Sequence, residues 1–124
     1  MPKTIFIIED DAFLQGLEAT KLKKEGFNVE TAADVEEVKK IIEKKSKVDL
    51  ILLDLMLPGV DGFEVLKIIK KEKNLSDTPV IVFSNLSEEK DIEKAKKIGI
   101  SEYMVKSNFN LDELVGKVRE MIGS

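Results

Sequence analysis

The sequence predicts an α/β fold in which five strands form one doubly wound parallel sheet with helices on both faces. The first observation behind this prediction is alternation, because short apolar runs and longer amphipathic segments follow one another along the 124 residues. The second is that the third and fourth apolar runs are almost continuously apolar, as strands buried on both faces must be. Parallel strands need crossover connections, so the intervening helices are expected to cover both sides of the sheet.

The predicted strands are the short apolar runs. In chain order they span Thr4–Glu9, Phe27–Thr31, Asp49–Asp54, Pro79–Ser84 and Glu102–Val105. In open parallel sheets, ligands bind beyond the carboxyl ends of the strands, at the point where the strand order reverses. The residues that end these runs are therefore the first candidates for a functional site.

The helices are predicted from apolar residues at helical spacing. Leu14, Leu17 and Leu22 mark the first helix, and the second begins at Asp34, which with Glu37 forms a start like a capping box. The remaining three helices are indicated by Phe63, Leu66 and Ile69, by Ile92, Ala95 and Ile98 within Glu88–Ile98, and by Leu111, Leu114, Val115, Val118, Met121 and Ile122 after Asn110.

Residues that favour helix ends stand where the predicted helices begin and end. Asp11 precedes the first helix, and we expect it to be the N-cap of that helix rather than a ligand. Gly26, Gly99 and Gly123 fall just past the ends of the first, fourth and fifth helices, where a left-handed backbone is wanted.

Composition narrows the class of protein. A chain of 124 residues has the size of one domain, which we expect to span 1–124. The net charge of −4 gives no electrostatic reason to expect direct nucleic-acid binding. No apolar run approaches the roughly 20 residues needed to cross a bilayer. The absence of cysteine is compatible with the cytoplasmic location that we expect.

The missing residue types narrow the chemistry further. Without histidine or cysteine, this chain cannot form a Ser-His-Asp triad, a thiol nucleophile or a zinc-thiolate site. Carboxylate, hydroxyl, lysine and tyrosine groups remain for covalent or acid–base chemistry. A metal would therefore have oxygen ligands and would be a hard cation such as Mg²⁺.

Four of the five predicted strands end in groups that suit such chemistry. These groups are Glu9 and Asp10, Asp54, Ser84 and Lys106. Clustered carboxylates repel one another unless a cation neutralises them, and oxygen ligands of this kind match Mg²⁺. Beside such a metal, Asp54 can act as a nucleophile towards a phosphoryl donor, while a lysine ammonium stabilises the phosphoryl oxygens.

Four motifs extend this pattern over the whole chain: IIEDD, LLDLMLPGVDG, VIVFSN and EYMVKS. The separations are 44 residues from Asp10 to Asp54, 30 from Asp54 to Ser84 and 22 from Ser84 to Lys106. In these motifs and spacings the chain resembles, from end to end, a receiver domain of the two-component response regulators, of the stand-alone chemotaxis-regulator kind. The resemblance implies a flavodoxin-like (βα)5 sandwich with strand order 2-1-3-4-5.

The resemblance also implies the roles of individual residues. Asp54 corresponds to the phosphoacceptor and Lys106 to the phosphate-binding lysine. Glu9, Asp10, Asp54 and the backbone carbonyl of Met56 would hold Mg²⁺, with Mn²⁺ as an alternative. No enzymatic activity is implied beyond Mg²⁺-dependent self-catalysed phosphoryl transfer and autodephosphorylation.

The signalling part of the resemblance involves Ser84 and Tyr103. Ser84 corresponds to the switch hydroxyl, and Tyr103 to the aromatic that turns inward when this hydroxyl is drawn to the phosphate. The output surface would be the fourth helix, fifth strand and fifth helix. The implied partners are a sensor histidine kinase or phosphotransfer protein and a downstream protein target. We expect no membrane partner, and either a monomer or a weak phosphorylation-dependent dimer, acting alone or within a longer protein.

Four positions depart from the family pattern or tune it. Ser107 replaces the usual proline after the lysine, and we expect the Lys106–Ser107 peptide to be cis nonetheless, at a cost of about 2.5–4 kcal/mol. Asn85 stands where a small residue is usual, so exchange with small phosphodonors should be slower than in an Asn85→Ala variant. Met56 and Leu86 are both apolar, which predicts a long-lived acyl phosphate.

Three other classes of function remain open from the sequence. A phosphatase of the haloacid dehalogenase type also uses an Asp nucleophile and Mg²⁺, but Asp54 is followed by Leu55 and Met56 instead of a second acid two residues later. A flavodoxin-like carrier would need a hydroxyl- and glycine-rich phosphate loop after the first strand, where this chain has three acids. A phosphorylation-independent interaction module is the third alternative.

Overall fold

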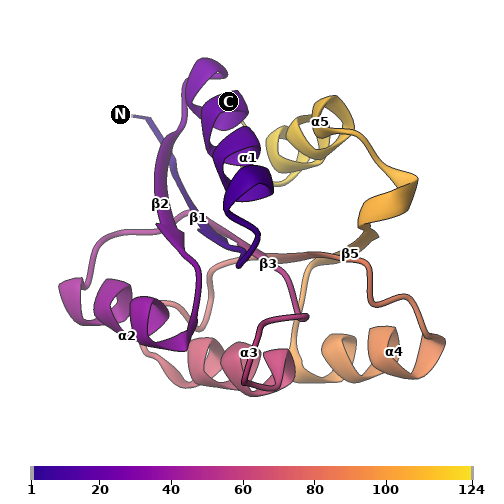
Figure 1. Ribbon diagram of the computed structural model, residues 1–124. Helices are drawn as coiled ribbons and strands as arrows, with labels where there is room; N and C mark the ends of the chain where they lie inside the picture. Colours follow the sequence, from indigo (N-terminus) through magenta and orange to yellow (C-terminus); the bar gives the residue numbers. More distant parts are fainter. Residues whose placement is uncertain (1, 124) are drawn as a thin grey trace.

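The computed structural model describes residues 2–123 and has a five-stranded parallel sheet between two layers of helices (Figure 1). The strands are β1 (Thr4–Ile8), β2 (Asn28–Ala32), β3 (Leu50–Leu53), β4 (Val80–Ser84) and β5 (Glu102–Val105). The helices are α1 (Ala12–Lys24), α2 (Val35–Lys44), α3 (Gly62–Lys71), α4 (Glu89–Ile98) and α5 (Leu111–Ile122), with a short 3₁₀ helix η1 (Lys106–Asn108). The strand order β2-β1-β3-β4-β5 confirms the predicted fold.

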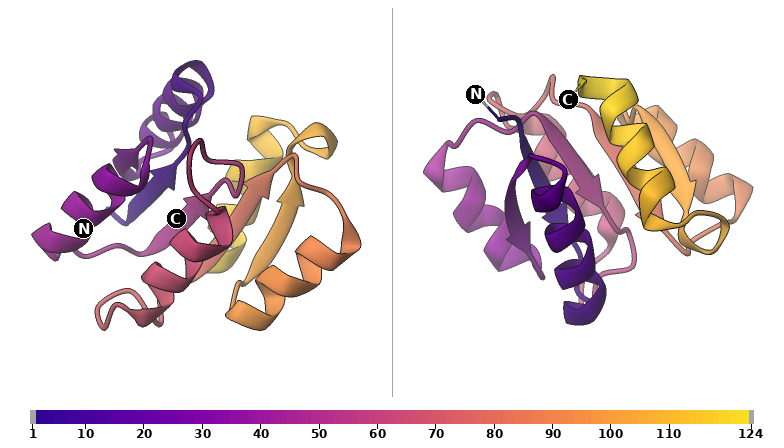
Figure 2. Two further views of the ribbon diagram at one scale, coloured as in Figure 1. Left: turned by 60° about the horizontal axis from the view of Figure 1, so that its bottom comes forward. Right: turned by 90° about the horizontal axis from the view of Figure 1, so that it is seen from above.

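The two faces of the sheet are covered by different helices. Helices α2, α3 and α4 lie on one face, and α1 and α5 lie on the other (Figures 1 and 2). Side chains alternate along β1, so that Phe6 and Ile8 belong to the first core and Ile5 and Ile7 to the second. Burial on both faces is the reason that the central strands are apolar throughout.

The register of the sheet places the carboxyl ends of β1 and β3 next to each other. Ile8 is paired with Leu53, and the Asp54 N–H donates to the Ile8 carbonyl at 3.0 Å. Glu9 and Asp54, which directly follow these two paired strands, therefore lie side by side. This is the point at which the strand order reverses, with β2 on one side of β1 and β3 on the other.

The predicted helix ends are confirmed. Asp11 caps α1, accepting from the Phe13 and Leu14 N–H groups at 3.0 and 3.1 Å. Asn110 and Glu113 form a reciprocal capping box at the start of α5. The glycines expected after helix ends all have positive φ, at 98° for Gly26, 124° for Gly99 and 79° for Gly123.

The inward face of α1 differs from the one that its leucines suggest. Leu17 is 42% exposed, whereas Glu18 is 2% exposed and Leu22 is 1% exposed. The buried line follows every fourth residue from Leu14, which is partly buried, through Glu18 to Leu22. An acid thus occupies a core position of α1, and a leucine lies on its outer side.

Candidate functional site

Three strand ends supply the candidate site. Glu9 and Asp10 directly follow β1, Asp54 directly follows β3, and Lys106 directly follows β5 as the first residue of η1. One ligand oxygen from each of the three carboxylates lies within 4.8 Å of the others, so they form a cluster that could hold a metal ion. Glu9 and Asp54 are buried and Asp10 is exposed, which leaves the cluster open to solvent on one side.

Lys106 lies inside this cluster. Its Nζ donates to Asp54 Oδ2 at 2.7 Å and also to Glu9 Oε1. The other Asp54 oxygen, Oδ1, accepts the Met56 N–H at 2.9 Å. Both oxygens of Asp54 are therefore oriented, one by an ammonium and one by the backbone of the following loop.

The pKa values of Glu9 and Lys106 are set by two opposing effects. Burial disfavours the charged form of each group, and the hydrogen bonds within the cluster favour it. Burial raises the pKa of Glu9, and the hydrogen bond from Lys106 offsets part of this rise. For Lys106, burial acts to lower the pKa, but its hydrogen bonds to Asp54 and Glu9 prevail and raise it. Lys106 is thus held as a cation, and the carboxylates around it are a donor set that fits a hard divalent ion.

The expected cis peptide between Lys106 and Ser107 is wrong, because residues 2–123 contain no cis peptide bond. The chain turns immediately after β5 into η1, where the Phe109 N–H bonds to the Lys106 carbonyl at 3.3 Å. This turn brings the ammonium to Asp54 with a trans bond. The cost of about 2.5–4 kcal/mol for a cis bond before a non-proline residue is therefore avoided.

Ser84 and Tyr103 are connected through one residue. Ser84 is fully buried, and its Oγ accepts the Leu86 N–H at 3.2 Å. The Tyr103 hydroxyl donates to the carbonyl of the same Leu86. Leu86 therefore joins the two predicted switch residues, a role that the sequence offered no means of finding because the contact is made by its backbone.

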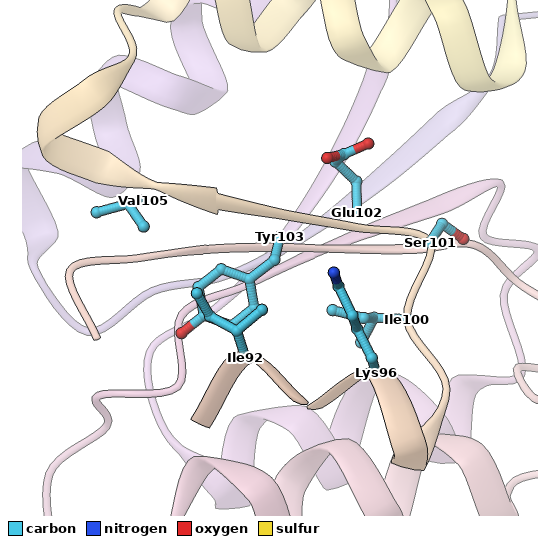
Figure 3. Close-up of a pocket in the computed structure, with 7 residues that line it drawn as sticks. All are labelled: Ile92, Lys96, Ile100, Ser101, Glu102, Tyr103 and Val105. Atoms are coloured by element: carbon cyan, nitrogen blue, oxygen red, sulfur yellow. The ribbon is translucent and has the colours of Figure 1, made fainter. Parts of the chain in front are cut away.

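Tyr103 also forms a wall of a groove between α4 and β5. Figure 3 shows its ring beside Ile92, with Lys96 further along the same helix. The groove is lined by Ile92, Lys96, Ile100, Ser101, Glu102, Tyr103 and Val105. Because Tyr103 lines this groove and bonds to the loop after β4, a movement of its ring would change both together.

Glu18 is a further acid near the cluster that sequence reasoning missed. Burial raises its pKa to about 8, and the charge of Glu9 adds to the rise. The charges of Lys106 and Asp54 also act on it, Lys106 in the opposite direction. The signal that could have found it is its position, four residues from both Leu14 and Leu22 on α1.

Comparisons with known proteins agree with this arrangement. A sequence model of the response regulator receiver domain matches residues 5–119. The chain belongs to this family. A relative named as a probable transcriptional regulator, ycf27 of Porphyridium aerugineum, is 35% identical over 118 residues, which cover 95% of this chain and 47% of the relative. The receiver chain spans about half the length of the curated relatives that it matches.

Two solved structures are similar to the receiver chain over its whole length. The first is the receiver domain of the sensor histidine kinase PA1611 from Pseudomonas aeruginosa PAO1, with a magnesium ion coordinated in its active-site cleft. It is 27% identical, with a TM-score of 0.85 and full coverage of both chains. The second is the phosphorylated cyanobacterial phytochrome response regulator RcpA, 32% identical with a TM-score of 0.86, covering 100% of this chain and 96% of its own.

Family membership bears on two of the three other classes of function that the sequence left open. The chain is a receiver domain, a module of two-component signalling, and not a dehalogenase-type phosphatase or a flavodoxin-like carrier.

Within residues 2–123, no helix combines the length and the apolar character needed to cross a membrane.

Proposed function

We propose that this receiver domain accepts a phosphoryl group on Asp54 from a sensor histidine kinase or phosphotransfer protein and thereby switches its output surface. The observation that carries the proposal is the position of Lys106, whose Nζ lies 2.7 Å from Asp54 Oδ2 within a cluster of acids. An ammonium in this place can neutralise the charge that a phosphoryl group brings to Asp54.

The chemistry follows from Asp54 and its neighbours. An Asp54 oxygen forms the bond to phosphorus while the bond between phosphorus and the donor's imidazole nitrogen breaks, and that nitrogen keeps the electron pair. Lys106 then donates to a phosphoryl oxygen. Glu9, Asp10, Asp54 and the Met56 carbonyl would hold Mg²⁺ or Mn²⁺, which when bound neutralises the acids and stabilises phosphoryl charge. No further enzymatic activity is part of this proposal.

Two relatives support this chemistry. The magnesium ion in the cleft of the PA1611 receiver domain supports the same ion here, and phosphorylated RcpA supports phosphorylation of a receiver of this fold. Support from this chain itself is the donor set, because the three carboxylates lie within 4.8 Å of one another.

The switch would operate through Leu86. Ser84 Oγ accepts the Leu86 N–H, so the hydroxyl proton of Ser84 is left to donate to a phosphoryl oxygen. A shift of Ser84 towards the phosphoryl group would move Leu86, whose carbonyl holds the Tyr103 hydroxyl. The signal would thus reach the groove between α4 and β5, part of the proposed α4–β5–α5 output surface.

The donor is proposed to dock over the acidic cluster, because exposed apolar residues are neighbours in sequence of the residues that form it. In residues 2–123 the exposed large hydrophobic side chains are Phe13, Leu17, Met56 and Phe109. Phe13 follows the β1 acids, Met56 follows Asp54, and Phe109 follows η1, so these three lie close in sequence to groups of the site. Exposed apolar side chains of this kind fit contact with a protein partner.

The partners proposed for the receiver domain are therefore proteins: the phosphodonor on one side and a downstream target on the other. We propose no direct contact with nucleic acid or membrane, a cytoplasmic location, and one functional unit over residues 1–124. This unit would be a monomer or a weak phosphorylation-dependent dimer.

The test is intact-mass analysis after incubation with acetyl phosphate and Mg²⁺. The protein should gain one phosphoryl group, and Asp54→Asn should gain none. Asp11→Asn is the matched control, since it removes a neighbouring acid but keeps a residue that caps helices well. It should gain the group as the unchanged protein does. No gain in the unchanged protein would favour the phosphorylation-independent interaction module instead.

A further inference from the structure

Gly62, the first residue of α3, lies directly against the backbone of Leu55. A Cβ atom at Gly62 would be 2.1 Å from the Leu55 carbonyl oxygen and 2.4 Å from the Leu55 Cα. Both distances are far inside van der Waals contact. Gly62 is not among the glycines with positive φ, so the missing side chain, and not an unusual backbone, is what this position requires.

Leu55 is the residue between Asp54 and Met56, which the proposed function assigns to the metal site. The Met56 N–H donates to Asp54 Oδ1 at 2.9 Å, so the backbone on both sides of Leu55 is tied to the acceptor carboxylate. The side chain of Leu55 is itself buried, at 4% exposed. A displacement of the Leu55 backbone therefore cannot occur without moving Asp54, Met56 or both.

The first turn of α3 lies against Leu55 and is held in place by contacts of its own. Asp61 caps the helix by accepting the Phe63 N–H at 2.9 Å. Phe63 is buried, and the Lys94 ammonium of α4 lies over its ring at 4.4 Å from the centroid. Because this turn is held by its cap and by α4, it cannot easily withdraw if an atom is added at Gly62.

We propose that Gly62 is a positioning residue for the metal site, because it lets α3 abut Leu55 and so sets where the Asp54 carboxylate and the Met56 carbonyl point. This inference rests on the proposed function. An added methyl group would require a shift of about 1 Å, a misplacement large enough to disable a site that depends on exact geometry. Mg²⁺ accepts little departure from octahedral geometry, so its affinity should report the shift.

A simpler alternative is that Gly62 only allows the chain to fold. Both alternatives predict that Gly62→Ala destabilises the protein, so stability alone does not separate them. They differ in the affinity of the folded protein for Mg²⁺. Positioning predicts weaker binding by the folded fraction, whereas a purely structural role predicts unchanged binding.

The experiment is an NMR titration with Mg²⁺ of the full chain, which reports the folded population and the dissociation constant in one sample. Gly62→Ala should bind Mg²⁺ at least about tenfold more weakly than the unchanged protein. Gly16→Ala and Gly116→Ala are matched controls, because a Cβ at either position meets no atom within 4 Å beyond the chain neighbours and backbone of its own helix. Val118→Ala, which truncates a fully buried side chain of α5, controls for lost stability.

The controls should keep their affinity for Mg²⁺ within about twofold. An unchanged dissociation constant in Gly62→Ala, or an equal loss in Val118→Ala, would overturn the inference while leaving the proposed function in place. Absence of Mg²⁺ binding by the unchanged protein would overturn both.

A second pair of variants applies if Gly62→Ala does not fold. Asp61→Ala frees the first turn of α3 without adding an atom, whereas Asp61→Asn removes the same charge but keeps a capping residue. Weaker Mg²⁺ binding by Asp61→Ala than by Asp61→Asn supports positioning by α3. Equal affinities of the two variants would count against it.

Discussion

Tyr103 reaches from β5 to the loop after β4, where its hydroxyl donates to the Leu86 carbonyl. Leu86 in turn donates its N–H to the buried Ser84. Ser84, at the end of β4, and Tyr103, which lines the α4–β5 groove, thus both bond to the backbone of Leu86. This link makes the position of the Tyr103 side chain sensitive to the loop that follows Ser84.

Ionisation of Tyr103 provides the first prediction. Burial raises its pKa to about 12, so the folded state favours the neutral phenol. Its contribution to stability is complete below the unfolded pKa of about 10 and is lost as the pH rises towards 12. Since Tyr103 is the only tyrosine and the chain has no tryptophan, absorbance at the phenolate band reports it alone. A midpoint near that of free tyrosine in the folded protein would contradict a hydroxyl that is partly buried and bonded to Leu86.

Glu18 provides the second prediction, for the metal-free protein in chelator. Its pKa is raised to about 8, so ionising it costs folding free energy, and the penalty grows as the pH rises from about 4.5 to 8. Glu18→Gln should therefore stabilise the protein by up to about 3 kcal/mol at pH 7 and by little at pH 4. Urea denaturation at both values measures this. Exposed Glu36→Gln is the control, expected to show no such pH-dependent gain.

Removal of Lys106 provides the third prediction. Lys106→Met leaves Glu9 and Asp54 facing each other without a cation, and truncation of one partner in such a buried group costs about 3 kcal/mol. The midpoint of thermal unfolding in chelator should fall accordingly. Mg²⁺ should then raise the midpoint more in Lys106→Met than in the unchanged protein, because the ion replaces the missing charge. Lys97→Met, an exposed lysine of α4, should show neither effect.

Met56 provides the fourth prediction, on the lifetime of the acyl phosphate. Its side chain is 55% exposed and lines the cleft that also contains Asp10 and Leu86. An amide at this position can bind and orient water near Asp54, so Met56→Asn should hydrolyse its phosphate several-fold faster, by about 1 kcal/mol of barrier. Single-turnover decay followed by intact mass measures the rate. Met56→Leu, which stays apolar, should decay at the original rate.

Much of the fold could be predicted because its determinants are local. A local pattern is enough to recognise each of them. Examples are the apolar runs of β3 and β4, the Asp11 cap and the Asn110–Glu113 capping box. The place of the candidate site was predictable as well. Its residues follow strand ends, and parallel strands have their carboxyl ends at one edge of the sheet. Their assignment as site residues remains a prediction.

The features that the sequence did not predict depend on how the backbone is placed in three dimensions. The need for glycine at position 62 becomes visible only when the Leu55 backbone is seen beside it. Glu18 occupies a core position that the leucine pattern of α1 assigned to Leu17. The cis peptide at Ser107 was wrong because a turn of 3₁₀ helix, and not the peptide isomer, directs Lys106.

Lys106 gives the resting receiver domain a counter-ion of its own. Because its ammonium already bonds to Glu9 and Asp54, the two carboxylates are partly neutralised before any solute arrives. We expect a cation that binds Glu9 to compete with Lys106 for this carboxylate, so that loading of the pocket would be an exchange of partners. The affinity of the pocket for a metal would then be a difference between two attractions, and we expect it to rise in a variant in which Lys106 no longer bonds to Glu9.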